Sequence, residues 1–327
     1  MPKIDKFTMT VDLLSNMLWN GSAQRKTLES GMDGFLQKTG RTGNRDINCK
    51  YAVYDARAVV QESHYSEMQE KDIITEKLGG IGHELNRWDA AVHDAIVSLY
   101  EDGVTEFTVK MVIDVLGGKK SYHRRYTAKQ LSTVKETIEN LRNTVIKIDA
   151  SDEVELRVQG NRRCPDYKYS GRLLPAEEVD TTVSGQPVKA YRIDEEAGMP
   201  MYFYGGRKRQ VCMVDINVIN VPISFSVQVA AVTRFLFAEV TSMYSPTFFR
   251  YNKILVDTFL KAMDPIIHVG KSSMRMKRVD LFDQCEVILN YWKEIGYIKD
   301  WSWELKSDGS KKAMLIKLAD RTPTEED

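Results

Sequence analysis

The fold is decided first by residues 86–118, which read NRWDAAVHDAIVSLYEDGVTEFTVKMVIDVLGG. Apolar residues recur at steps of three and four over residues 88–99, which predicts an amphipathic helix over 86–102. A short extended piece at 105–107 follows, and Thr108 can cap a second helix that ends at a pair of glycines. This stretch therefore predicts the order helix, short strand, helix.

The next residues extend this order with a third helix. Thr127 and Gln130 have the spacing of a capping box, and the apolar residues of 131–141 fall on one face of the helix that follows. Residues 145–149 and 154–158 then alternate like strands. Helix, short strand, helix, helix, strand, strand is the order of a winged helix, so we expect one such module here.

The same order recurs over residues 223–318. Ser224 or Ser226 can cap a helix that ends near residue 244, and Ser245-Pro246 predicts the start of a second helix, which ends at Asp264-Pro265. An amphipathic helix over 282–295 and a hairpin with its turn at 307–309 complete the order. The two copies share no obvious residue-level repeat, so the predicted duplication is one of architecture.

A β-rich middle separates the two copies. Residues 167–174, 188–193 and 201–219 read as strands, and in the N-terminal part only residues 47–53 alternate like one. We therefore expect an α+β protein with tandem winged-helix (helix-turn-helix) domains joined by a β-rich segment. The predicted divisions are an N-terminal extension (1–80), module 1 (81–160), an elaborated wing and linker (161–222), module 2 (223–319) and an acidic tail (320–327).

The composition excludes several classes of protein. The chain of 327 residues has 46 basic and 46 acidic side chains, which excludes a uniformly basic DNA-coating protein but allows a local basic face. Charged residues interrupt even the longest apolar stretch (227–240), so no segment is expected to span a membrane. The start, MPKIDKFTMT, lacks the apolar core of a secretory signal, and we expect a cytoplasmic protein.

No motif predicts a cofactor, a metal site or an enzyme. The chain lacks a P-loop, and its cysteines and histidines lack metal-ligand spacing, so we expect reduced thiols and no cofactor. Tyr122-His123 lacks the histidine pair that a rolling-circle nickase needs. A metal-dependent nuclease site assembled from distant carboxylates stays open. The cysteines and histidines that lack metal-ligand spacing are Cys49, Cys164, Cys212, Cys285, His64, His83, His93, His123 and His268.

Basic residues gather where DNA-binding modules need them. Residues 119–129 carry five cations and no acid, and residues 271–278 form a second acid-free basic loop; each leads into a predicted third helix. Polar side chains on those helices are candidates for base contacts. A basic pair and a run of three basic residues at predicted wing tips are candidates for backbone or minor-groove contacts. The candidate DNA-binding residues are Lys119, Lys120, Arg124, Arg125, Lys129, Gln130, Thr133, Arg162, Arg163, Arg207, Lys208, Arg209, Lys271, Arg275, Lys277, Arg278 and Gln284.

Each of these features has a competing structural interpretation. The basic loops can be ordinary charged loops beside solvated helices, and for the basic residues at the wing tips a solvated hairpin is an equal alternative. The recurrence of a basic loop at the same point of both copies favours DNA contact for the loops. His93 and the tryptophans are expected to be packed or half-buried rather than to stack on bases; these are Trp88, Trp292, Trp301 and Trp303.

Two further stretches carry a resemblance to a known family. One is residues 122–149, in which a capped helix leads into LRNTVIKID, and the other combines GRLLPAEEVDTTVSGQPVKAYRI (171–193) with MPMYFYGGRKRQVCMVDINVINVPIS (199–224). The second resembles a linker segment in proteins of Gram-positive mobile elements. With the element order of 86–318, the chain resembles the two-winged-helix (RepA-like) replication initiators of bacterial plasmids and mobile elements.

The resemblance implies sequence-specific binding to repeated origin sites in double-stranded DNA. It also implies recruitment of host replication proteins and a monomer–dimer switch, with the main major-groove contact in the second module. Three alternatives remain open: a winged-helix transcriptional regulator or partition protein, a docking module that does not bind DNA, and the metal-dependent nuclease named above.

Overall fold

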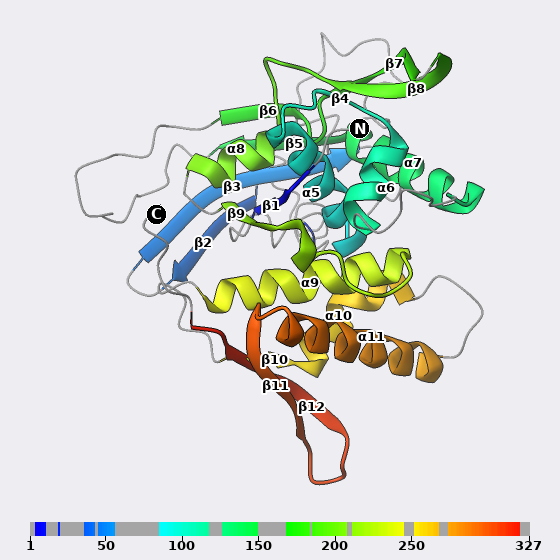
Figure 1. The fold of residues 1–327 in the computed structure, drawn as a ribbon. Coiled ribbons are helices and arrows are strands. Elements are labelled where there is room, and N and C mark those ends of the chain that lie inside the picture. Colours follow the sequence, from blue (N-terminus) through cyan, green and yellow to red (C-terminus); the bar gives the residue numbers. More distant parts are fainter. Residues whose placement is uncertain are drawn as a thin grey trace.

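The computed structural model describes residues 4–10, 19, 36–42, 45–55, 85–117, 126–149, 168–183, 185–207, 211–244, 252–267 and 274–320. Helices and strands are mixed throughout this part of the chain, which confirms the predicted α+β class (Figure 1). None of its helices combines the length and the apolar character needed to cross a bilayer.

The first half of the molecule builds three helices and a three-stranded sheet. The sheet has the order β4-β8-β7, so the short first strand pairs with the last one, and both pairings are antiparallel. The elements are α5 (Arg87–Glu101), β4 (Glu106–Phe107), α6 (Val109–Gly117), α7 (Ala128–Asn143), β7 (Ala176–Val183) and β8 (Gln186–Ile193).

The second half repeats this arrangement. Its sheet has the order β10-β12-β11, which again places the short first strand beside the last one. Gly309, with φ of 79°, lies in the turn of the predicted terminal hairpin, where a left-handed backbone favours glycine. The elements are α9 (Val227–Met243), β10 (Lys253–Leu255), α10 (Val256–Ile267), α11 (Met274–Glu294), β11 (Ile298–Leu305) and β12 (Lys311–Leu318).

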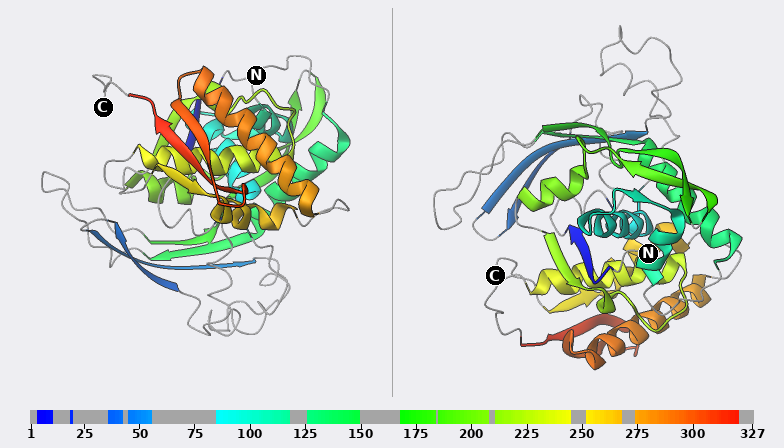
Figure 2. Two further views of the ribbon diagram at one scale, coloured as in Figure 1. Left: turned by 90° about the horizontal axis from the view of Figure 1, so that it is seen from below. Right: turned by 45° about the horizontal axis from the view of Figure 1, so that its top comes forward.

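Two further sheets flank this duplicated core. One is a two-stranded sheet, β1-β9, and the other has four strands in the order β2-β3-β5-β6; the latter curves along one side of the molecule (Figure 2). The strand predicted at 47–53 is confirmed as part of β3. The elements are β1 (Lys6–Thr10), β2 (Leu36–Thr42), β3 (Arg45–Asp55), β5 (Thr144–Asp149), β6 (Lys168–Arg172), α8 (Pro200–Arg207), β9 (Val211–Asp215) and the 3-10 helix η1 (Ile216–Val218).

The two halves pack against each other through α5 and α9, which lie across from one another in Figure 1. Every residue of α5 from Arg87 to Leu99 is buried, because α6, α7, α9 and β1 surround the helix. At the centre of the contact, Nε of Arg234 donates to Oδ2 of Asp94 at 3.0 Å, and both side chains are at most 2% exposed. A buried ion pair therefore joins the two halves.

Strand β1 adds a second connection between the halves. The backbone N–H of Thr8 donates to Oγ of Ser98 in α5 at 2.9 Å. The ring of Phe7 meets the ring of Phe237 in α9 edge-on, with 6.3 Å between the centroids. Because β1 also pairs with β9, this short strand contacts both halves and the segment that links them.

Residues 201–219 differ from the prediction of a continuous strand. Pro200–Arg207 form helix α8, and only Val211–Asp215 are extended before η1 begins. Met201 is buried, and the ring of Phe203 meets that of Tyr100 edge-on at 6.3 Å. The aromatic, strand-like composition of this segment is used for packing on α5, and such a tertiary contact overrides local β propensity.

The second helix of the second half also begins later than predicted. Its predicted start at Ser245-Pro246 lies outside the described residues, but Ile254 and Leu255 form strand β10 instead of helix. They pair with Met314 and Ala313 of β12, and the helix begins at Val256. It also continues through Pro265 to Ile267, beyond the predicted end.

The strands beside the third helix of the first half come from a different segment than expected. The strand predicted at 145–149 exists as β5, but it pairs with β3 and β6 instead of with β4. The partners of β4 lie at 176–193, in the predicted β-rich middle, while the strand predicted at 154–158 falls outside the described residues. The predicted domain boundaries stay predictions.

Candidate nucleic-acid interface

The start of α7 is built by a capping box, as predicted. Oγ1 of Thr127 accepts from the backbone N–H of Gln130 at 3.1 Å, and Oε1 of Gln130 accepts from the backbone N–H of Thr127 at 3.0 Å. Nε2 of Gln130 also donates to the carbonyl oxygen of Phe225 at 3.5 Å. The amide group of Gln130 thus holds the helix start in place, and base contact by this residue stays a prediction.

The two faces of α7 differ sharply. Val134, Ile138 and Leu141 are fully buried, and Oγ1 of Thr137 accepts from Nε1 of Trp88 at 2.7 Å. The opposite face is polar and open to solvent: its exposed residues are Lys129, Ser132, Lys135 and Glu136, with Thr133 half-buried at its margin. Lys129 makes no ion pair with any described residue, so its charge is available to an anionic partner.

A partly buried cluster of polar side chains holds α7 against the strands beside it. Nη1 of Arg142 donates to both oxygens of Glu139 at 2.8 and 3.0 Å, and its Nε donates to the carbonyl oxygen of Ala176 at 2.7 Å. The hydroxyl of Tyr191, in β8, donates to Oε1 of Glu139 at 2.9 Å. Burial, reinforced by this bond to a carboxylate, raises the pKa of Tyr191. The hairpin β7–β8 and the helix therefore form one rigid unit.

Ion pairs extend this unit at the surface. Nζ of Lys189 in β8 lies 2.9 Å from Asp180 and 3.3 Å from Glu178, and Nζ of Lys135 lies 3.9 Å from Glu178. The hydrogen bond to Asp180, followed by that to Glu178, raises the pKa of the Lys189 ammonium. These cations are partly neutralised by their partners, which leaves Lys129 as the stronger candidate for a phosphate contact among them.

The start of α11 presents the second candidate surface. Arg278 is exposed and makes no ion pair with any described residue, whereas Lys277 is half-buried. Gln284 is also half-buried, and its Oε1 is enclosed by protein. Figures 1 and 2 show α7 and the N-terminal end of α11 toward the same side of the molecule.

The helix α11 is anchored on its buried side. Nε1 of Trp292 donates to the carbonyl oxygen of Val218 at 2.8 Å, and the hydroxyl of Tyr291 donates to the carbonyl oxygen of Asn217 at 2.8 Å.

The tryptophans and His93 are packed as predicted. Trp88 and Trp292 are buried, and Trp301 and Trp303 are half-buried. His93 is fully buried.

Polar contacts also hold the terminal hairpin against α11. Oε1 of Glu286 accepts from Nε1 of Trp303 at 2.8 Å and from Nζ of Lys311 at 2.6 Å. The Lys311 ammonium lies 4.3 Å from the centroid of the Trp303 ring and 4.9 Å from that of Phe282, within cation–π range. No sequence motif singles out Lys311, because only the folded hairpin brings these neighbours together.

Most of the predicted loop and wing-tip residues lie outside the described part of the chain. For Arg207, in α8, and Arg275, in α11, the structure describes the backbone but not the side chain. Their DNA-binding role stays a prediction. The candidates outside the described residues are Lys119, Lys120, Arg124, Arg125, Arg162, Arg163, Lys208, Arg209 and Lys271.

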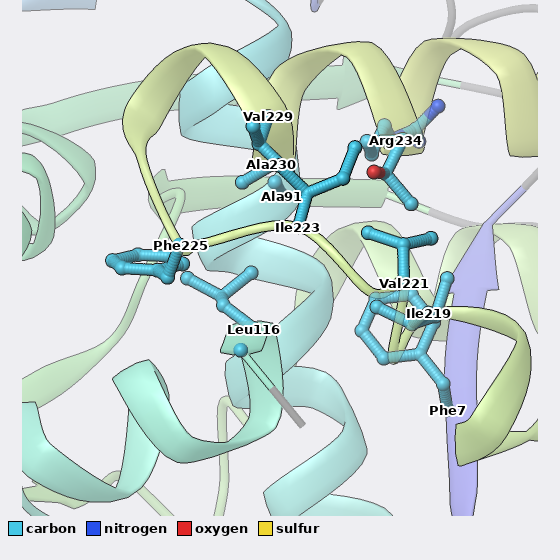
Figure 3. Close-up of a pocket in the computed structure, with 12 residues that line it drawn as sticks. Phe7, Ala91, Leu116, Ile219, Val221, Ile223, Phe225, Val229, Ala230 and Arg234 are labelled. Atoms are coloured by element: carbon cyan, nitrogen blue, oxygen red, sulfur yellow. The ribbon is translucent and has the colours of Figure 1, made fainter. Parts of the chain in front are cut away.

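A small pocket lies at the seam between the halves, where Phe7, Ala91, Ile223 and Arg234 converge (Figure 3). Its interior space of about 20 Å³ has room for about one water molecule, far less than a cofactor requires. Among the described residues, no cluster of His, Cys, Asp or Glu could hold a metal ion. The polar face of α7 and the start of α11, rather than this pocket, are therefore the candidate site.

No protein-family model matches the chain, and no curated protein matches it in sequence. Two solved structures are distantly similar. The RctB domains 2-3 match with a TM-score of 0.41 and 13% identity, and a selenomethionine derivative of domains 2 and 3 of RctB matches with a TM-score of 0.38 and 10% identity. Both matches cover 88% of this chain and 92% of the other. So distant a likeness says nothing of what this chain binds.

Proposed function

We propose that the chain is a sequence-specific double-stranded DNA-binding protein with two winged helices that initiates replication at origin repeats of a plasmid or integrative element. The observation that carries the proposal is the repeated arrangement of α5-β4-α6-α7-β7-β8 and α9-β10-α10-α11-β11-β12, with the same sheet order in each half. This is the order of elements in a winged helix, which presents its third helix to a major groove.

Charge at the starts of the third helices supports the proposal. Lys129 and Arg278 are exposed near the first turns of α7 and α11, and a helix start favours phosphate because its free amides point outward. The acid-free basic stretches 119–129 and 271–278 lead into the same two turns. Because both turns lie toward one side of the molecule, a single duplex can serve both.

We expect binding to a fragment of the parent replicon to weaken steeply with salt, since cations released from phosphates dominate the affinity. Replacing Lys129 and Arg278 together with alanine should lower the salt slope by about 2, or about 1 for each phosphate that is no longer neutralised. The measurement is fluorescence anisotropy on labelled duplexes across a salt series. Lys6→Ala, which removes an exposed cation from β1, is the matched control and should leave the slope unchanged. Binding that ignores salt would contradict the proposal.

The initiator role is separated from other DNA-binding roles by where the sites lie. Selection of bound fragments from the parent replicon should recover direct repeats beside an origin, and the double variant should fail to support replication of a plasmid that carries this origin. Sites that overlap promoters would instead indicate a regulator. No retarded fragment at low salt would indicate a docking module.

A further inference from the structure

The outer face of α11 is unlike that of a helix that lies along a DNA groove. Met276, Val279 and Val287 are 62%, 51% and 41% exposed, and residues three and four apart share a face of a helix. Asp280 and Asp283 are exposed between them. Further along the helix, the same face continues with the exposed residues Asn290 and Glu294.

Beyond its first turn, this face disfavours contact with a duplex. A major groove is lined on both sides by phosphates, and carboxylates held near them repel the backbone. The outer face of α7 differs, because it presents two lysines and Ser132 with a single carboxylate; its exposed residues are Lys129, Ser132, Lys135 and Glu136. The cations of α11 are Arg275, Lys277 and Arg278 near its start and Lys293 in its last turn, and Lys293 lies 2.7 Å from Asp300.

We propose that the outer face of α11, defined by Met276, Val279, Asp280, Asp283 and Val287, binds a basic amphipathic helix of a partner protein. Three exposed apolar side chains in one stripe match the apolar anchors that such a helix presents at steps of three and four. The flanking carboxylates match lysine or arginine beside those anchors, and charge complementarity of this kind selects the partner. The proposal does not depend on the protein binding DNA.

The charges favour this occupant over two others. A second copy of the chain packed on the same face about a two-fold axis would bring Asp280 and Asp283 of one copy against the same residues of the other, which is repulsive. An anionic lipid surface would be repelled by the same carboxylates. A cationic protein helix satisfies both the apolar and the acidic components.

The test uses the full chain and a synthetic amphipathic helical peptide of leucine and lysine, with a peptide of leucine and glutamate for comparison. Methyl NMR of protein with ¹³C-labelled methionine reports on Met276, whose signal is assigned with Met276→Leu. The Met276 signal should shift and saturate with the lysine peptide and not with the glutamate peptide. No shift, or equal shifts with both peptides, would overturn the proposal.

Two double variants make the test specific. Asp280→Asn with Asp283→Asn should weaken peptide binding by about tenfold, as should Val279→Ser with Val287→Ser. Glu195→Gln with Glu196→Gln removes two exposed carboxylates from another loop and should leave binding unchanged. Both α11 variants should keep the thermal unfolding midpoint of the parent, and the valine variant should also keep its DNA affinity. A loss of DNA affinity in the valine variant would show that this face enters the groove, and would overturn the proposal.

If the parent protein binds no DNA, the peptide titration still shows whether α11 binds a basic helix, because the signal comes from Met276. Conversely, salt-dependent DNA binding by a protein that ignores the peptide would retain the proposed function and remove only the docking site. The two proposals therefore fail separately.

Discussion

Replacing Asp94 with alanine is expected to lower the free energy of unfolding by about 3–5 kcal/mol, because it leaves the Arg234 guanidinium without its carboxylate in the interior. The two side chains are 1% and 2% exposed, so the Arg234 guanidinium stays in the interior when the carboxylate is removed. Equilibrium denaturation with urea, followed by tryptophan fluorescence and circular dichroism, measures the change.

Two comparisons should show that burial causes this effect. Removing the carboxylate of Asp320, which is 97% exposed and lies 3.5 Å from Nζ of Lys299, should cost less than about 1 kcal/mol. Replacing Asp94 and Arg234 together with leucine and methionine should recover much of the stability, since no charge is then buried alone. If the single and double variants were equally unstable, the ion pair would not be the cause.

Replacing Phe7 with alanine is the second change expected to have a large effect. The side chain is 2% exposed and packs against Phe237, so its truncation should lower the free energy of unfolding by about 3–5 kcal/mol. Because β1 contacts both halves, the variant should also let them separate more readily. Hydrogen exchange measured by mass spectrometry should show faster exchange in α5 and α9 than in the parent protein.

The matched control for this variant is Leu305→Ala, which truncates a side chain that is 56% exposed on the terminal hairpin. Its effect on stability should stay within about 0.5 kcal/mol. Were Phe7→Ala equally mild, strand β1 would be dispensable for the fold instead of a connection between its halves.

Features with local causes could be predicted from the sequence. The capping box of Thr127 and Gln130 lies within a single helical turn, and the structure confirms both of its hydrogen bonds. The hairpin β11–β12 follows from two alternating segments and a turn that contains Gly309. The helix from Arg87 to Glu101 follows from apolar periodicity and the cap at Asn86.

Features with distant causes could not be predicted. Strand β5 pairs with β3, a segment far earlier in the chain, and nothing in residues 144–149 specifies that partner. Ile254 and Leu255 have helical periodicity with the residues after them, yet they pair with β12 in a sheet. In both cases the strand partner decides the outcome, and the partner lies far away in the sequence.

The sequence indicates where the candidate site lies, but not which of its side chains are exposed. Acid-free basic stretches indicate which helices to consider, but the half-buried position of Gln284 and the use of Gln130 in a cap depend on the packed structure. The Asp94–Arg234 pair could not be predicted from the sequence, because both helices carry other charged residues and the two partners lie 140 residues apart.

The contact between α5 and α9 fixes the distance between the two halves, because a buried ion pair and the strand β1 hold them together. Under the proposed function, two halves on a loose tether would tolerate a range of distances between their DNA sites, whereas two halves held rigidly would not. Base pairs added between the two sites would change both their separation and their rotational phase about the duplex axis. The proposed function therefore implies one permitted spacing between the two sites.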